Sequence, residues 1–418
     1  MNVDDRVKVV RKHNLCMNCL AHSHIARDCK SPFNCLSSHQ RHHSLLHRFA
    51  MTRFWELEEI PNRKKQMNQE ESYCEDQFRN TTARDGEGRY MVSLPFRREF
   101  PTDVSLGYSR NSATQQLLRN ESSLLRRPEL KAEYDKVLEE YIKLGHMVRV
   151  ENSGGRPHDT FYILFFLPHH AVIKPDSTTT KVRVVFNASS PSSNGVSLND
   201  VLHPEPVLQA DLVCLLLKWR FFKYVFNADI EKMYRQIRLQ PDNKRYQRIV
   251  YRGSQNEELM DYELLTVTFG VNCVPYLAIG TLFQLADDVS ARWPLVSKVL
   301  KQYMYVDDVL AGAYDRETAI QTRDELIEAL KGAGFPLRKW TSNTTSILAG
   351  LPKEHLLKEE FLNIDDLSEA KMLGIRWNAA QDAFYFNVQH IQVRHSYSKR
   401  EVLSCVAKLF RPVGWVRS

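Results

Sequence analysis

Two adjacent acidic residues, Asp307 and Asp308, have the clearest chemical potential in this chain. They lie in the sequence YMYVDDVL (residues 303–310), between aromatic and β-branched residues. Such residues favour extended structure and Asp-Asp favours a tight turn, so we predict a β-hairpin with two carboxylates at its tip. Hard divalent cations such as Mg²⁺ take oxygen ligands, which makes the tip a candidate metal site. Taken alone, the pair is equally compatible with an exposed acidic turn that has no chemical role.

Asp229 is the candidate for a third metal ligand. It ends the apolar run YVFNAD (residues 224–229), and a short helix-like segment that contains Tyr234 follows. A carboxylate at the C-terminal end of a strand, where the chain turns, is well placed to bind a metal ion. Because Asp229 is far from Asp307 and Asp308 in the sequence, only a folded sheet could combine the three carboxylates into one site.

A second predicted hairpin presents basic side chains. Its first strand lies within residues 161–174, which end in Lys174, and its second lies in the alternating sequence KVRVVFNAS (residues 181–189). Alternation with a period of two places Lys181 and Arg183 on one face. Basic side chains on a hairpin would suit a triphosphate, although ordinary solvated surface charges would give the same pattern.

Three cysteines and a histidine near the N-terminus have the spacing of a zinc site. The pattern is Cys16-x2-Cys19-x4-His24-x4-Cys29. Three thiolates and one imidazole complete a tetrahedral shell without an open position for a substrate, so the site is expected to be structural. The segment is too short to build a hydrophobic core, and zinc binding is therefore expected to drive its folding.

A second group of potential metal ligands follows the first. Its members are Cys35, His39, His42, His43 and His47. Short tracts rich in cysteine and histidine often bind metals. A solvated, histidine-rich linker is an equal alternative for this group.

The composition limits the class of protein. The chain has 418 residues, of which 43% are hydrophobic, and a formal net charge of +7; roughly two to four folded units are expected. We find no run of about 18 apolar residues and no signal peptide, which predicts an intracellular protein without a transmembrane helix. Residues 1–50 carry eight Lys and Arg against three Asp and Glu, which indicates a polyanionic partner.

Other segments are expected to position these residues. Apolar residues recur at helical spacing within residues 112–144, which predicts two helices. Residues 266–275 are predicted to form a loop around Gly270 that leads into a helix. Asp287 and Asp288 form another acidic pair, but their context is an amphipathic helix, so we predict a solvated face without a catalytic role.

The order of these motifs resembles the Gag–Pol proteins of BEL/Pao-type LTR retrotransposons. The Cys-Cys-His-Cys pattern is similar to the CCHC zinc knuckle of Gag proteins, which bind single-stranded RNA. The sequence HHSLLH (residues 42–47) is similar to a second zinc module of that family, with Ser38 in place of one cysteine. The resemblance implies an α+β fold with reverse-transcriptase fingers and palm, which is a right-hand polymerase with an antiparallel palm sheet and helices. Small zinc-knuckle modules would precede it, and a truncated thumb would follow.

The resemblance also implies a division of the chain. Residues 1–50 would be the zinc-knuckle region, with one intact and one degenerate module. Residues 51–155 would be a polar linker and a helical lead-in, and residues 156–350 would be the fingers and palm. Residues 351–418 would hold the primer-grip region and the start of the thumb, with no RNase H or integrase region after them.

For the carboxylates, the resemblance implies two-metal catalysis. Asp229 and Asp307 would be the main ligands of two Mg²⁺ ions, and Asp308 would assist them. The reaction would be nucleotidyl transfer by an RNA-directed DNA polymerase, with Mg²⁺ and Zn²⁺ as cofactors. Its partners would be an RNA template, a DNA primer and deoxynucleoside triphosphates. In an intact element the enzyme would act inside a virus-like particle.

For the incoming nucleotide, the resemblance implies five binding residues. Lys174 and Arg183 would hold the phosphates, and Lys339 would lie near them. Tyr234 would be a steric gate beneath the sugar that leaves no room for a 2′-hydroxyl. The loop at Gly270 would hold the template and the base.

Several departures from the family leave a second function open. Phe269 stands where retroviral enzymes have glutamine, and Ser38 interrupts the second zinc module. We also find no protease motif, and the thumb-like segment is short. The alternative is therefore a catalytically inactive, retrotransposon-derived protein that binds RNA or DNA.

Overall fold

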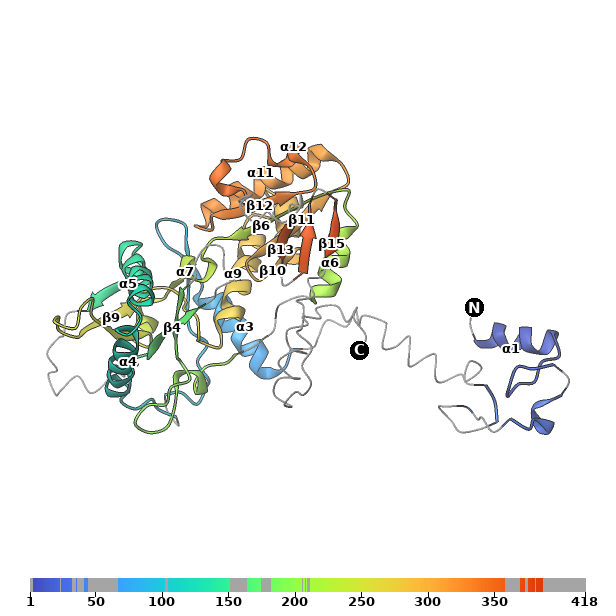
Figure 1. The fold of residues 1–418 in the computed structure, drawn as a ribbon, viewed down its shortest axis with the longest axis horizontal. Coiled ribbons are helices and arrows are strands. Elements are labelled where there is room, and N and C mark those ends of the chain that lie inside the picture. The colour runs from blue at the N-terminus through green and yellow to red at the C-terminus, as the bar shows by residue number, and fades with distance from the viewer. Residues whose placement is uncertain are drawn as a thin grey trace. The chain divides into compact units, whose positions relative to one another are not determined.

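The structure is a computed structural model in which the chain forms two compact units, Met1–Asn68 and Gln69–Ser418. We refer to them as the N-terminal unit and the main unit. Helices and small sheets are mixed, which confirms the predicted α+β class (Figure 1). The structure describes residues 3–22, 24–31, 35, 41–43, 67–101, 104–150, 164–173, 182–204, 206, 208, 211–357, 369–372, 375–379 and 381–385.

The N-terminal unit begins with helix α1 (Val3–Lys12), and a 3₁₀ turn, η1 (Ala26–Asp28), follows later in the chain. Between them the chain folds back on itself, because Cys16 and Ala21 are joined by a backbone hydrogen bond of 2.9 Å and Leu20 donates to Cys16 at 2.8 Å. Leu20 closes this turn with a positive φ of 61°.

A four-stranded antiparallel sheet is the centre of the main unit. Its order is β10-β11-β6-β12. The strands are β10 (Met304–Tyr305), β11 (Asp308–Ala313), β6 (Tyr224–Ile230) and β12 (Leu337–Ser342). Helices α10 (Pro294–Gln302) and α11 (Arg316–Gly332) pack against this sheet, and α9 (Val274–Asp288) packs against α10. We call the sheet the central sheet.

Phe226, Ala228 and Ile230 alternate along β6 and are fully or almost fully buried, so one face of the central sheet belongs to the core. Asp229 lies between Ala228 and Ile230 and therefore points to the opposite face. Val225 and Asn227, on the same face as Asp229, are also buried, so both faces of this strand pack and Asp229 lies near its partly exposed end.

Two helices and a second set of strands make up another part of the main unit. Helix α4 (Arg110–Leu124) packs against strand β8 (Arg248–Tyr251), and helix α5 (Pro128–Lys143) packs against strand β5 (Val182–Phe186). The two helices confirm the prediction for residues 112–144. Strand β5 pairs with β4 (His169–Ile173), and β8 lies in a sheet with β9 (Met260–Leu264) and β3 (Met147–Val150).

Shorter elements connect these parts. They are α3 (Gln69–Thr81), β1 (Ala83–Arg84), β2 (Tyr90–Val92), η3 (Leu198–Asp200), α6 (Leu212–Arg220), α7 (Met233–Gln236), β7 (Arg238–Leu239), α8 (Pro241–Lys244), α12 (Thr345–Leu348), η4 (Lys353–His355), β13 (Glu369–Met372), β14 (Ile375–Asn378) and β15 (Ala383–Tyr385). Strand β2 pairs with β1 and, in parallel, with β7, while β13, β14 and β15 form an antiparallel sheet.

One continuous hydrophobic cluster runs through the main unit, from Cys74 of α3 to Ala379 beside β14. Trp219 illustrates how it joins separate segments. The indole ring of Trp219 packs edge-on against Trp377 with 4.8 Å between the ring centroids, and its N–H donates to the carbonyl of Ala311 at 3.0 Å. The segments before and after the central sheet therefore share its core.

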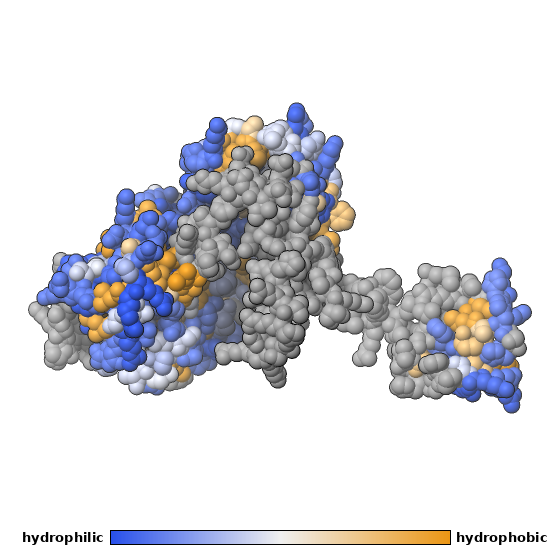
Figure 2. Space-filling model, viewed as in Figure 1, coloured by the Kyte–Doolittle hydropathy of each residue, from blue (hydrophilic) through white to orange (hydrophobic). Residues whose placement is uncertain are grey.

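The described surface in view is mostly hydrophilic, with scattered apolar patches (Figure 2). No helix in the described part of the chain is long and apolar enough to cross a membrane.

His169 is a buried histidine that makes the stability of the main unit depend on pH. Its Nε2 lies 2.9 Å from the carbonyl oxygen of Val250, so Nε2 carries the proton and Nδ1 accepts a hydrogen bond from the hydroxyl of Tyr134. Burial lowers the pKa of His169 to about 4. In the unfolded chain the pKa would be about 6.5.

We therefore expect the free energy of unfolding to fall as the pH is lowered from about 6.5 to about 4, because the unfolded state binds a proton at His169 in this range and the folded state does not. His169→Gln should make this pH dependence shallower. His170→Gln, in the exposed neighbour on the same strand, should leave it as in the wild type. Denaturant unfolding at a series of pH values measures both, and equal slopes for His169→Gln and wild type would contradict this assignment.

Candidate functional site

The central sheet brings the three predicted carboxylates together. Asp308 of β11 lies directly opposite Asp229 of β6 in the antiparallel register. Asp307 precedes Asp308 in the turn of the β10–β11 hairpin, and its carbonyl accepts a 2.8 Å hydrogen bond from the N–H of Ile230. Segments that are distant in the sequence thus place three acidic side chains at one end of two neighbouring strands.

The hairpin turn that carries Asp307 is tight and strained. Tyr305 pairs with Asp308, so only Val306 and Asp307 form the turn. Val306 has a positive φ of 55°, which costs a β-branched residue on the order of 1–2 kcal/mol. Such strain persists only where the surroundings hold it in place, as the hydrogen bonds on both sides of this hairpin do.

Burial and mutual repulsion oppose the ionisation of these carboxylates. Burial, followed by the charges of Asp307 and Asp229, raises the pKa of Asp308 to about 8. Burial and the charge of Asp229 also raise the pKa of Asp307. The site therefore resists full ionisation without added positive charge, and an oxygen-rich donor set of this kind suits Mg²⁺.

Lys339 supplies positive charge to the site. It lies in a bulge of β12, where the pairing with β6 shifts between Arg338 and Thr341, and has a positive φ of 54°. Its Nζ forms an ion pair with Oδ2 of Asp229. Lys339 was predicted near a bound triphosphate, and the structure places it on a carboxylate of the predicted metal site.

The three carboxylates are neighbours without forming a closed cage. Among the described residues, the only group of three or more Cys, His, Asp or Glu side chains arranged so that they could hold a metal ion is Cys16, Cys19, His24 and Cys29. A cation that used Asp229 would compete with the ammonium group of Lys339. The carboxylate oxygens and their negative charge suit Mg²⁺. As the side chains are arranged here, however, Asp229 is paired with Lys339.

Two of the predicted nucleotide-binding residues lie within electrostatic range of the carboxylates. The charge of Arg183, an exposed residue of β5, lowers the pKa of Asp307 against the effect of burial. Burial, followed by the charge of Asp307, raises the pKa of Tyr234 to about 12. Lys174 lies outside the described residues.

Gly270 lies in a loop that packs directly on the strand of Arg183. Its φ is +103°, and a Cβ atom there would lie 1.8 Å from the carbonyl oxygen of Phe186, the last residue of β5. Asn199 holds the same loop, because its side-chain amide donates to the carbonyl of Gly270 at 3.1 Å and its Oδ1 accepts from the N–H of Asn272 at 3.0 Å. Asn199 was not predicted from the sequence, since a lone asparagine in a turn carries no distinguishing pattern.

Phe269 contacts the predicted sugar gate. Its ring lies 4.8 Å from the ring of Tyr234, measured between centroids, and 39% of Phe269 is exposed. Phe269 therefore places an aromatic surface beside Tyr234.

Gly270→Ala is expected to destabilise the main unit by about 3–5 kcal/mol, because it adds a backbone clash to an unfavourable φ. Gly350→Ala is the matched control: its φ is +83°, but its Cβ would meet nothing within 4 Å. That variant should lose only about 1–2 kcal/mol. Urea unfolding measures both, and equal losses would show that the close approach to Phe186 is not a constraint.

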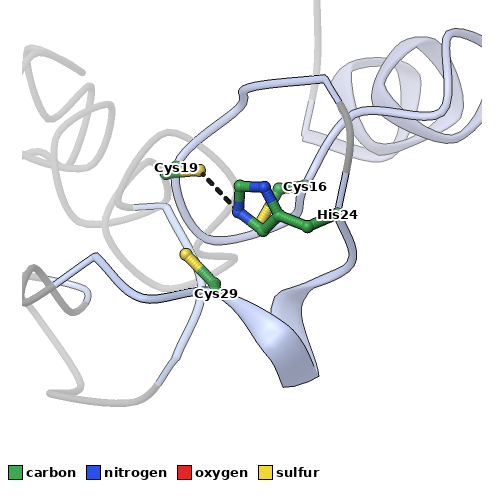
Figure 3. A group of neighbouring side chains, drawn as sticks. All are labelled: Cys16, Cys19, His24 and Cys29. Atoms are coloured by element: carbon green, nitrogen blue, oxygen red, sulfur yellow. Dashed lines mark hydrogen bonds between the residues drawn. The ribbon is translucent and has the colours of Figure 1, made fainter.

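The four predicted zinc ligands converge in the N-terminal unit. Cys16, Cys19, His24 and Cys29 place their ligand atoms within 4.8 Å of one another. Figure 3 shows the sulfur of Cys19 facing the imidazole of His24, and this Sγ–Nε2 distance is 3.3 Å. Zinc–ligand bonds of about 2.0–2.3 Å can be accommodated between atoms at such separations.

Asn18 donates hydrogen bonds to two of the three sulfurs in this cluster. The backbone N–H of Asn18 donates to Sγ of Cys16 at 3.4 Å, and its side-chain amide donates to Sγ of Cys29 at 3.6 Å. The hydrogen bond from Asn18, followed by one from the backbone of Ser31, lowers the pKa of Cys29 to about 6. The donor set and these N–H···S contacts fit a structural zinc ion, so this cluster could bind a metal such as zinc.

The second group of predicted ligands is described only in part. Cys35 is fully buried, and the backbone N–H of His43 donates to the carbonyl of Met17 at 2.7 Å. Arg41 donates to the carbonyl of Cys29. This segment therefore folds onto the first module, while Ser38, His39 and His47 lie outside the described residues.

The acidic pair Asp287-Asp288 lies at the end of α9, as the sequence predicted. Asp287 is 63% exposed and pairs with Lys301, whereas Asp288 accepts hydrogen bonds from Tyr90 and Arg84. Asp288 is thus less solvated than predicted, and it links α9 to the β1–β2 hairpin.

No protein-family model matches this chain, and no curated protein matches it in sequence. The functional assignment therefore depends on the chemistry and geometry of its own residues.

Proposed function

We propose that the chain is an RNA-directed DNA polymerase of the BEL/Pao retrotransposon type, with reverse-transcriptase fingers and palm in the main unit. The observation that carries this proposal is the register pair Asp229–Asp308, with Asp307 in the adjoining turn. Arg183, from a different strand, lies within electrostatic range of the same carboxylates. Acidic residues at a strand end, with an arginine within electrostatic range, suit transfer of a nucleotidyl group from a triphosphate to a hydroxyl, with pyrophosphate as the leaving group.

In this proposal the carboxylates would hold two Mg²⁺ ions, which when bound would supply activation of the primer 3′-hydroxyl and stabilisation of the leaving pyrophosphate. Asp229 and Asp307 are the main ligands, and Asp308 assists them. Arg183 orients the triphosphate through charge-assisted hydrogen bonds. When the triphosphate binds, the ammonium group of Lys339 leaves Asp229 and pairs with a phosphate oxygen. Its positive charge therefore remains in the site.

Tyr234 selects the sugar in the proposed reaction. Its ring is half-buried, packs on Phe269 and lies within range of Asp307. A rigid ring at this position excludes a 2′-hydroxyl by contact, so deoxynucleotides are the expected substrates. Gly270 brings the neighbouring loop close to β5 and completes that side of the nucleotide site.

The N-terminal unit is proposed to bind single-stranded RNA through its zinc-stabilised fold. Lys8, Arg11, Lys12 and Lys30 are exposed cations on this unit, and 63% of Ile25 is exposed. Apolar residues there form a patch bordered by hydrophilic ones (Figure 2). Cations bind phosphates and an exposed apolar side chain can contact an unstacked base, which together favour single strands.

Primer extension tests the proposal directly. The full chain should add deoxynucleotides to a DNA primer on an RNA template with Mg²⁺, and EDTA should stop the reaction. Absence of incorporation, together with RNA binding that depends on zinc and salt, would instead support the inactive binding protein. The Lys339–Asp229 ion pair is the observation that favours this second function, because it occupies a proposed metal ligand.

A further inference from the structure

An ionic network joins helix α5 to the turn that carries Tyr234, and its Glu140 and Lys232 side chains are 40% and 31% exposed. Its centre is Arg235, whose side chain is 8% exposed. The Nη2 atom of Arg235 lies 2.7 Å from Oε1 of Glu140, and its Nε donates to Nδ1 of His146 at 2.9 Å. The guanidinium also lies over the ring of Tyr141, 4.0 Å from its centroid. A buried arginine is thus enclosed by three groups from α5 and the residues that follow it.

Glu140 also forms an ion pair with Lys232, at the start of the same turn. Its Oε1 lies 2.8 Å from Nζ of Lys232, the residue that precedes α7. Lys232 has a positive φ of 53°, an unfavourable conformation for a lysine. The N–H of Arg235 donates to the carbonyl of Lys232 at 2.8 Å, which closes the turn. One carboxylate oxygen therefore binds the cations on both sides of Tyr234.

The charges in this network make Glu140 its indispensable member. Burial alone would raise the pKa of Glu140, but the hydrogen bond from Lys232 and the charge of Arg235 outweigh it and lower the pKa. Burial and the charge of Arg235 lower the pKa of His146 to about 3, so His146 is neutral. Without the negative charge of Glu140, the buried guanidinium of Arg235 would keep, of the partners described above, neutral His146 and the Tyr141 ring. A buried positive charge without a carboxylate partner destabilises the fold.

Tyr234 lies between the two anchored residues in the sequence, and its ring packs against that of Phe269, with 4.8 Å between the centroids. A steric gate works by excluding a single oxygen atom, so a displacement of about 1 Å is enough to weaken it. The conformation of residues 232–235 therefore sets how strictly the ring excludes a 2′-hydroxyl.

We propose that Glu140 is a positioning residue for Tyr234, and that through Lys232 and Arg235 it sets the discrimination between deoxyribonucleotides and ribonucleotides. This inference rests on the proposed polymerase function. It assigns a role in substrate choice to a residue of the helical lead-in, outside the segments that carry the carboxylates. Glu140 touches neither substrate nor metal in this role.

The test compares Glu140→Gln with Glu139→Gln in the full chain. Glu139 is the exposed neighbour on the same helix, and its variant should behave as the wild type. The measurement is kcat/KM for a deoxynucleoside triphosphate and for the matching ribonucleoside triphosphate at one primer terminus. Glu140→Gln should lower the ratio of the two by roughly 10- to 100-fold. A role in folding alone would lower both values together and leave the ratio unchanged, which would overturn the inference.

Lys232→Met provides a second variant in case Glu140→Gln does not fold. It removes one cation and leaves Arg235 paired with Glu140, so the loss of discrimination should be in the same direction and smaller. An unchanged ratio in this folded variant would also count against the inference.

A spectroscopic measurement separates the inference from the proposed function. With 3-fluorotyrosine at position 234, Glu140→Gln should shift or broaden the ¹⁹F resonance, and Glu139→Gln should not. If the wild type shows no primer extension, the polymerase proposal and the role in discrimination both fail, while the ¹⁹F result still decides whether Glu140 positions Tyr234. If the wild type extends primers and neither the ratio nor the resonance changes, only the inference about Glu140 fails.

Discussion

Asp307→Asn is expected to reduce primer extension by the full chain at least about 10³-fold. The substitution keeps the size of the side chain and removes one negative charge from the turn between β10 and β11. Because burial and neighbouring carboxylates raise the pKa values of Asp307 (through Asp229) and Asp308 (through Asp307 and Asp229), the site depends on cations to stabilise its ionised form. Loss of one carboxylate therefore weakens metal binding as well as catalysis. Single-nucleotide addition on an RNA template with Mg²⁺ measures the effect.

Asp287→Asn is the matched control for that substitution. It makes the same chemical change in another pair of consecutive aspartates, Asp287 and Asp288, at an exposed position at the end of α9. Extension by Asp287→Asn should remain within about twofold of the wild type, since surface substitutions usually change little. RNA binding by both variants should be unchanged. An Asp307→Asn enzyme as active as the wild type, or an equal loss in both variants, would remove the metal site from the proposal.

The residue patterns that predicted structure correctly were local ones. Alternation in residues 181–189 predicted a strand that presents Arg183 on one face, and the structure has Arg183 exposed while Val182, Val184 and Phe186 are buried. Aromatic and β-branched residues around Asp307 and Asp308 predicted the hairpin, and the helical spacing around Asp287 predicted a helix. In each case the neighbours in the sequence are also the neighbours that determine the conformation.

The interactions that the sequence did not reveal join residues that are far apart along the chain. Lys339 reaches Asp229 because a bulge in β12 shifts the pairing with β6, and a bulge has no reliable sequence signal. Glu140 and Arg235 meet only because α5 packs beside the turn after β6. Both pairs depend on tertiary packing, so a single sequence offers no period or spacing from which to predict them.

The candidate site combines backbone strain with several charged side chains. Val306 and Lys339 each adopt a positive φ near the carboxylates. Such conformations destabilise the fold unless other contacts compensate, and hydrogen bonds from Ile230 and Leu310 hold the hairpin. Strained backbone conformations and neighbouring carboxylates both lower the stability of the fold. Their occurrence together at one place is typical of functional sites.

Removal of zinc is expected to unfold the N-terminal unit and to weaken binding of single-stranded RNA at least about tenfold, because the exposed cations lose their common scaffold. Cys29→Ser should have the same effect, since it removes a thiolate that is stabilised by Asn18 and Ser31. Fluorescence anisotropy with a labelled RNA oligonucleotide, with and without a zinc chelator, measures the affinity. Atomic absorption measures the zinc content of each preparation.

Cys214→Ser is the control for the cysteine substitution, because Cys214 lies in α6 of the main unit and outside the cluster. It should leave zinc content and RNA affinity unchanged. Primer extension at saturating template should survive the chelator when Mg²⁺ is in excess, because the carboxylate site belongs to the other unit. If the chelator strips zinc and the RNA affinity stays the same, the N-terminal unit is not the RNA-binding element. If Cys29→Ser still binds one zinc ion with wild-type affinity, the ligand set Cys16, Cys19, His24 and Cys29 is wrong.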